Sequence, residues 1–238
     1  MRHSFRDKPG ASAPNLRPGA RLGLLLGAVL ASLFTLTGFA QPVFPEISSR
    51  TEAIAALEHT DPRERASAIA YLGRTGMAGD APLLVRHLAD ENPLVRELAE
   101  QNVWKVWSRS GDPAVDRLLA EGVAQMQAGD LDKAIATFGG VIMQKPGFAE
   151  GWNKRATAWY LKGRFRESLA DCDEVMKRNP QHFGALSGYG QIYLQLEEFD
   201  KSLDYLHRAL AVNPNLQGVQ AEIEQIEALQ RERRRRMI

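Results

Sequence analysis

The chain has 238 residues, of which 44% are hydrophobic and 25% are charged, and these proportions are typical of a globular protein. Its 30 basic residues almost balance its 29 acidic ones, which argues against a protein that binds nucleic acid or another polyanion over its whole surface. The single cysteine, Cys172, excludes an internal disulfide framework and a cysteine-rich zinc site. The charge is uneven along the chain: residues 1–40 contain five basic groups and one acidic group, whereas residues 41–230 contain 20 basic and 27 acidic groups.

Residues 1–40 have the order of a secretory signal peptide. A basic stretch precedes nineteen residues without a charge, 22–40, which end in the small residues Gly38 and Ala40. We expect cleavage after Ala40, so that the mature chain begins at Gln41. The alternative is a retained membrane anchor, because nineteen residues at ~1.5 Å each would span roughly 28 Å of the ~30 Å hydrocarbon core. Both alternatives place the rest of the chain outside the cytoplasm.

Residues 51–110 carry a 31-residue period. The stretch 61–68 aligns with 92–99, and in both an Asp or Asn precedes a Pro, with an Arg three residues before an Ala. Asp61 and Asn92 suit the N-cap position and the following Pro suits the first helical position, while Glu64 stands where a capping box would use it. The pattern predicts a helix that begins after each of these caps.

The end of this segment is expected to pack against the part of the chain that follows. An apolar arc on the second predicted helix contains Trp104 and Trp107, and we expect it to fill the junction with the first of the 34-residue units described next. Asp112 and Pro113 then predict the start of another helix.

A second period, of 34 residues, begins at Val115. Pro146, Pro180 and Pro214 are spaced by it, and units that begin at residues 115, 149 and 183 agree at many positions. Positions eight and twenty are small in every unit, which predicts two helices that touch there. The residues at these two positions are Gly122, Ala156 and Gly190, and Ala134, Ser168 and Ser202.

The turns between the two predicted helices are centred on Gly129, Gly163 and, in the third unit, Glu197, where the Gly is missing. Glycine suits such a turn because it adopts the left-handed conformation that ends a helix. The Pro at position thirty-two closes the second helix of each unit, since it has no N–H to continue the helical ladder. Cys172 falls at a core position of the second unit, where we expect it to be buried.

This pattern resembles tetratricopeptide repeats, with Trp152 at position four, Ala134 at twenty and Phe138 at twenty-four. The resemblance covers residues 115–216 as three units, 115–148, 149–182 and 183–216. The 31-residue pair in residues 51–110 resembles short HEAT-like repeats. The resemblance implies an all-α fold, an α-α superhelix or right-handed solenoid of helix-turn-helix units, of an exported bacterial type.

Residues 217–238 are predicted to form a C-terminal capping helix, because apolar residues recur there every three or four positions. The helix ends in an arginine-rich tail that contains Arg231 and the run Arg233, Arg234, Arg235 and Arg236. Cations at the C-terminal end of a helix offset its dipole. The alternative for the tail is contact with anionic lipid or with an acidic partner.

The sequence carries no recognisable catalytic motif. None of its five His residues lies four positions from another, and it has no Gly-x-Ser-x-Gly and no phosphate-binding glycine loop. Acidic clusters at residues 171–174 and 197–200 are interpreted as solvated helix and turn surfaces. We therefore expect no enzyme, no metal and no cofactor. An enzyme would need a polar cleft between the two kinds of repeat.

In the resembled family the first helices of the units form a concave groove for peptides, through positions two, five, six, nine, twelve and thirteen. The mapping gives a mainly apolar first unit and places Glu150 and Gly184 at position two of the next units. The polar candidates for peptide binding are Asn153, Lys154, Thr157, Tyr160, Ser187 and Gln191.

Family members that clamp the C-terminal carboxylate of a chaperone use Lys, Asn and Arg at defined groove positions. Here those positions hold Leu119, Val123, Lys154, Gly184 and Gly188. The clamp is missing, so chaperone tails are not expected as ligands.

The sequence thus predicts a non-enzymatic scaffold that binds a protein or peptide in the groove and does not bind nucleic acid. The expected location is the periplasm, as part of the cell envelope. The alternative is a peripheral or anchored membrane protein that acts as an assembly factor, held by its apolar N-terminal segment or by Arg233, Arg234, Arg235 and Arg236.

Overall fold

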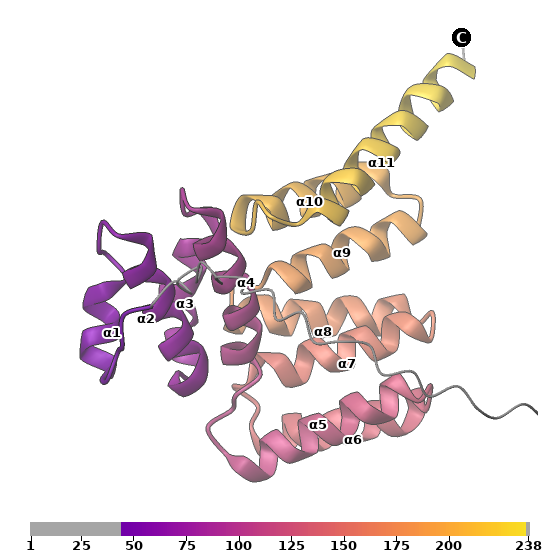
Figure 1. Ribbon diagram of the computed structural model, residues 1–238. Coiled ribbons are helices and arrows are strands. Elements are labelled where there is room, and N and C mark those ends of the chain that lie inside the picture. Colours follow the sequence, from indigo (N-terminus) through magenta and orange to yellow (C-terminus); the bar gives the residue numbers. More distant parts are fainter. Residues whose placement is uncertain (1–43, 237–238) are drawn as a thin grey trace, which may run out of the picture. The chain divides into compact units, whose positions relative to one another are not determined.

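Helices joined by short turns make up the structure, a computed structural model that describes residues 44–236 (Figure 1). Within these residues there is no β-strand, so the all-α prediction is confirmed. The signal peptide or anchor expected at residues 1–40 lies outside the described residues. No helix among residues 44–236 has the length and apolar character needed to cross a bilayer.

The first six elements belong to the segment with the 31-residue period. They are α1 (Arg50–Ala56), α2 (Pro62–Thr75), the 3-10 helix η1 (Ala78–Asp80), α3 (Ala81–Val85), the 3-10 helix η2 (Arg86–Ala89) and α4 (Pro93–Trp107). Helices α2 and α4 pack against each other over a core of small and branched aliphatic residues.

The remaining seven helices include three antiparallel pairs and a final helix. They are α5 (Pro113–Gln127), α6 (Leu131–Gln144), α7 (Ala149–Leu161), α8 (Phe165–Arg178), α9 (Phe183–Gln195), α10 (Phe199–Val212) and α11 (Gln217–Arg236). Each pair occupies one of the 34-residue periods, and successive pairs stack side by side (Figure 1).

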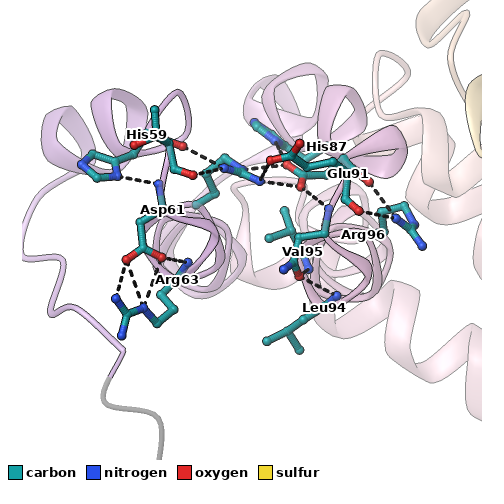
Figure 2. A network of polar contacts seen from close by, with 12 residues as sticks. His59, Asp61, Arg63, His87, Glu91, Leu94, Val95 and Arg96 are labelled. Atoms are coloured by element: carbon teal, nitrogen blue, oxygen red, sulfur yellow. Dashed lines mark hydrogen bonds and ion pairs between the residues drawn. The ribbon is translucent and has the colours of Figure 1, made fainter.

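The predicted helix starts are confirmed by their caps. Asp61 accepts the amide of Arg63 at 2.9 Å, and Asn92 accepts the amide of Leu94 at 3.0 Å. Asp112 caps α5 in the same way. The capping box expected of Glu64 does not form, because the amide of Asp61 donates instead to Nδ1 of His59 at 3.0 Å, as Figure 2 shows.

The 31-residue period appears in space as a repeated arginine contact. In both copies the arginine Nη1 donates to two backbone carbonyls in the turn that precedes its own helix, at 2.8–3.2 Å. Such contacts satisfy carbonyl groups that a turn would otherwise leave unpaired. The pairs are Arg65 with the carbonyls of His59 and Thr60, and Arg96 with those of Asp90 and Glu91 (Figure 2).

Each of these arginines also reaches the next layer of the structure. Arg65 binds both carboxylate oxygens of Asp90, at 2.8 and 2.7 Å, and Arg96 donates to Asn215 Oδ1 at 3.2 Å. Asn215 in turn donates to the carbonyl of Leu88 at 2.7 Å. The loop between α10 and α11 therefore lies against η2 and α4, although it is more than a hundred residues away in the sequence.

Small residues bring the helices of each pair into contact at positions eight and twenty, as predicted. A Cβ on Gly190 would lie 2.4 Å from Leu206 Cδ2, and one on Gly122 would lie 2.5 Å from Phe138 Cε1. In the second and third units the serine at position twenty also bonds across the pair: Ser202 Oγ donates to the carbonyl of Gly190 at 2.7 Å, and Ser168 Oγ makes the equivalent bond at 2.8 Å.

The turn within each pair requires a left-handed residue, whether or not glycine is present. Gly129 and Gly163 have φ values of 82° and 72°. Glu197, at the same position of the third unit, has a φ of 58°, although a side chain makes this conformation unfavourable. The chain geometry of the repeat therefore imposes this turn on Glu197.

Helix α11 covers the end of the last pair through Val219, Ile223 and Ile226, which pack against Leu206, while Leu229 is exposed. Beyond this apolar contact the helix is exposed. There its side chains reach the last pair through polar contacts of Gln230 and Arg233 and through the packing of Arg233 over the ring of Phe199. The apolar part of the predicted cap is thus formed by the first half of the helix.

Candidate functional site

Five of the six predicted binding residues line one hollow between α7 and α9. The hollow has a volume of about 140 Å³, well above the ~15 Å³ needed to hold one water molecule. Gly188 and the buried Cys172 contribute to its wall, and the prediction that Cys172 is buried is confirmed. The five residues are Asn153, Thr157 and Tyr160 from α7, and Ser187 and Gln191 from α9.

The hydroxyl hydrogen atoms of the threonine and serine residues in the hollow already donate to backbone carbonyls. Thr157 Oγ1 donates to the carbonyl of Asn153 at 3.0 Å, and Ser187 Oγ donates to the carbonyl of Phe183 at 2.9 Å. Ser168, which also lines the hollow, donates to a carbonyl as well. The oxygens of these three hydroxyl groups therefore present only their acceptor lone pairs to a ligand.

Lys154, the sixth predicted residue, points away from the hollow. Its Nζ lies 2.9 Å from Oε1 of Glu150 and 5.8 Å from the ring centre of Trp104. Lys154 thus neutralises a buried carboxylate.

Glu150 is the centre of a buried polar network that the sequence did not reveal. The resemblance placed this residue on the groove surface, but it is only 1% exposed, and His182 beside it is fully buried. His182 Nδ1 accepts the amide of Ala185 at 3.1 Å, so the ring proton sits on Nε2, which donates to Glu150 Oε2 at 3.1 Å. Asn153 Nδ2 donates to the same oxygen at 3.2 Å, which leaves Asn153 Oδ1 as an acceptor.

These partners keep Glu150 ionised. Burial alone would raise the pKa of its carboxyl group, because a charged group loses its hydration there. The hydrogen bond from His182 and the charge of Lys154 outweigh this effect and hold the pKa below its ordinary value. No spacing signal pointed to this pair, since the two residues lie 32 positions apart and meet only through the stacking of two units.

The aromatic residues of α4 lie elsewhere than expected. Trp107 stacks on His182 with ring centres 4.2 Å apart, and Trp104 packs edge-on against Phe183 at 5.1 Å. The expectation that they fill the junction with the first 34-residue unit was wrong, because their partners belong to the boundary between the second and third units. The reason is the folding back of α4 along the stack, which sequence order does not show (Figure 1).

Next to this aromatic cluster is a cavity of about 540 Å³. It is lined mostly by apolar residues from η1, α3 and the loops that precede α7 and α9. Glu150 is the only carboxylate on its wall among the described residues. The converging carboxylates that an enzyme at this junction would need are therefore not found there. Likewise, no group of three metal-ligating side chains occurs among residues 44–236.

In the acidic cluster at residues 171–174, Asp171 does not lie on the solvated surface, whereas Asp173 is exposed, as predicted. Asp171 is only 4% exposed, and Arg155 binds both its oxygens, at 2.8 and 2.7 Å. The other cluster is exposed and lies near the C-terminal helix: Glu197 accepts from Arg233 at 2.8 Å, and Asp200 accepts from Gln230. Asp171 is buried because α7 and α8 pack together, which a helix-surface argument from the sequence alone does not include.

Comparison with known proteins identifies the 34-residue units. Two family models described as tetratricopeptide repeat match residues 119–181 and 160–223. A TPR repeat-containing protein of Rhizobium etli is 29% identical over 117 residues, which is 49% of this chain and 57% of the relative. The chain therefore spans little more than half the length of that curated relative.

Solved tetratricopeptide-repeat structures are similar to part of this chain at low sequence identity. The Sgt2 TPR domain from Aspergillus fumigatus has a TM-score of 0.50 and 19% identity, over 52% of this chain and 83% of that one. The first TPR of Spaghetti (RPAP3), solved with an HSP90 peptide, has a TM-score of 0.47 and 21% identity, over 48% of this chain and 91% of that one.

Proposed function

Because residues 119–223 are tetratricopeptide repeats, we propose that the protein is a non-enzymatic scaffold that binds a peptide or protein segment along α5, α7 and α9. The observation that carries this proposal is the hollow between α7 and α9, where polar side chains of two successive units converge. Polar groups that point into one hollow suit the backbone and side chains of an extended segment.

The partner is not expected to be a chaperone tail. Recognition of a terminal carboxylate requires cations in the groove, and the only lysine at a predicted groove position, Lys154, is already paired with Glu150. The proposed partner is therefore recognised through an internal segment or through uncharged groups.

We place this scaffold in the cell envelope because residues 1–40 have the order of a signal peptide or anchor. The N-terminal helices α1–α4 are proposed to be a pair of HEAT-like repeats, which packs against the boundary between the second and third 34-residue units. N-terminal sequencing of the purified protein tests the first point, since a mature chain that begins at Gln41 supports export with cleavage.

Affinity capture from envelope extract tests the binding surface. The wild type is compared with a Tyr160→Ala/Gln191→Ala variant, which alters the hollow, and with a matched Tyr71→Ala/Gln101→Ala variant in α2 and α4. A partner that is retained by the wild type and the matched control, but lost by the first variant, supports the proposal. If all three proteins capture the same partners, the hollow is not part of the binding surface.

A second proposal is contact with a membrane through the C-terminal arginines. Arg234 and Arg235 are exposed near the end of α11 and have no ion-pair partner among the described residues, whereas Arg233 and Arg236 pair with Glu197 and Glu232. Each free arginine near an anionic surface contributes up to ~1 kcal/mol. Sedimentation with vesicles that contain phosphatidylglycerol is expected to depend on Arg234 and Arg235, and equal binding by an Arg234→Gln/Arg235→Gln variant would refute this contact.

A further inference from the structure

Trp104 of α4 closes one end of the surface on which the proposed scaffold binds its partner. Its ring lies against Gly184 in the first turn of α9, and Nζ of Lys154 from α7 lies 5.8 Å from the ring centre. A Cβ at position 184 would stand 2.5 Å from Trp104 Cη2, so glycine is required there for the ring to fit. The N-terminal helices thus occupy part of the expected groove and leave the hollow between α7 and α9 as its open part.

The open hollow carries no charge. Neither an acidic nor a basic side chain is among the residues that line it. A charged ligand group that entered would lose hydration without gaining a partner of opposite charge, which is costly. Glu150, which accepts a hydrogen bond from Asn153 of the hollow, is already neutralised by Lys154. The hollow therefore selects against Asp, Glu, Lys and Arg.

The hollow is also rich in hydrogen-bond acceptors. The hydroxyl hydrogens of Thr157, Ser168 and Ser187 are bonded to backbone carbonyls, and Asn153 directs its amide nitrogen to Glu150. A ligand group with N–H donors matches these oxygens.

The rim supplies the complementary donors. Tyr160 and Gln191 line the hollow and have no side-chain hydrogen bond to another of the described residues, so their O–H and N–H groups remain available to a ligand oxygen.

Gly188 provides the space for close approach. A Cβ at this position would meet only Cys172 Sγ, at 3.8 Å, so the glycine is not needed for packing within the protein. Its lack of a side chain instead keeps the wall of the hollow open. A ligand can therefore approach the α9 backbone at this point.

We propose that the hollow binds the side-chain carboxamide of an Asn or Gln residue in an extended segment of the partner. The two N–H donors of the carboxamide face the oxygens of Thr157, Ser187 and Asn153, and its carbonyl oxygen faces the rim. This inference rests on the proposed function, because it names the chemistry by which that surface selects its partner.

Selection of a displayed library of random linear peptides on the full chain tests the inference. We expect enriched peptides to share one Asn or Gln, and we expect its replacement by Asp or Leu to weaken binding at least fivefold. Peptides that bind in the hollow with no such preference, or with a charged residue there, would overturn the inference and leave the proposed function standing. If no enriched peptide is sensitive to the Tyr160→Ala/Gln191→Ala variant, both fail.

Variants of the hollow give an independent measurement with synthetic versions of the enriched peptide. Thr157→Val and Ser187→Ala each remove one acceptor and are expected to weaken binding about fivefold, from ~1 kcal/mol for one net hydrogen bond. The matched controls are Thr75→Val and Ser108→Ala, whose hydroxyls make the same bond to a carbonyl of their own helix but lie outside the hollow.

Gly188→Ala tests the space rather than the hydrogen bonds. The new methyl group fits against the protein but narrows the hollow, so we expect binding to fall at least fivefold while the fold is kept. Unchanged peptide affinity in Gly188→Ala, Thr157→Val and Ser187→Ala would overturn the inference.

Discussion

The contact between the two helices of a unit can be tested by one substitution made at two positions of α9. Gly190 faces α10, and a Cβ there would lie 2.4 Å from Leu206 Cδ2 and 2.5 Å from its Cγ. Leu206 is completely buried, so it has no free space into which to move. Gly188 lies two residues earlier on the same helix, and a Cβ there would meet its nearest neighbour at 3.8 Å. The two alanine variants therefore differ only in what the new methyl group meets.

The two substitutions are expected to change the free energy of unfolding in opposite directions. Replacing a glycine by alanine inside a helix stabilises the fold by roughly 0.5–1 kcal/mol. Gly188→Ala should gain this amount, because its methyl group is accommodated. Gly190→Ala gains the same amount but forces an overpacked contact with Leu206, which typically costs about 1–3 kcal/mol. We thus expect the free energy of unfolding of Gly190→Ala to lie about 1–3 kcal/mol below that of Gly188→Ala.

Urea unfolding followed by far-UV circular dichroism measures this difference. A double-mutant cycle with Leu206→Ala identifies its cause, because the clash disappears when the leucine is shortened. The coupling energy between residues 190 and 206 should then be roughly 0.5–3 kcal/mol in the favourable direction. Equal stabilities for the two alanine variants, or a coupling energy near zero, would refute the close contact at position eight.

Three further measurements test individual residues. Because the pKa of Glu150 is lowered in the folded state, its contribution to stability is complete above the ordinary carboxyl value of 4.5 and is lost as the pH falls through the lowered pKa. The melting temperature of Glu150→Gln should therefore fall less steeply with acidification than that of the wild type. Parallel plots of melting temperature against pH for the two proteins would contradict this. Burial, together with the charges of Asp171 and Asp173, raises the pKa of the Cys172 thiol to about 12. Iodoacetamide should therefore label this thiol only after the protein is unfolded in urea. Rapid labelling of the native protein at mildly alkaline pH would show instead that the thiol is accessible. Glu197→Gly should stabilise the fold by about 1 kcal/mol, since glycine adopts the left-handed turn without strain and the exposed ion pair with Arg233 contributes little. An Arg233→Gln variant measures the contribution of the ion pair. If Glu197→Gly is less stable than the wild type after this contribution is subtracted, the left-handed backbone at Glu197 is not strained.

Only part of the candidate site could be predicted from the sequence. The repeat mapping gave the groove positions, and five of the six candidates do line one hollow. Lys154 does not line this hollow, because it pairs with Glu150, which sits one helical turn earlier with its carboxylate buried. The position of Lys154 in the repeat gives no sign of this pair. Glu150 is held there by His182 from the end of the second unit. A contact of this kind depends on how two units stack, which the period alone does not describe.

The sequence by itself determined the local structure: where α2, α4 and α5 begin, where the left-handed turns fall, and which small residues bring paired helices together. These features follow from interactions within a turn or between neighbouring helices, so they leave a periodic trace in the chain. Only the tertiary structure decided that α4 returns to the boundary of the second and third units, and that Trp104 covers Gly184. These contacts join segments about 80 residues apart. Because each contact occurs only once, no repeated spacing in the sequence indicates it.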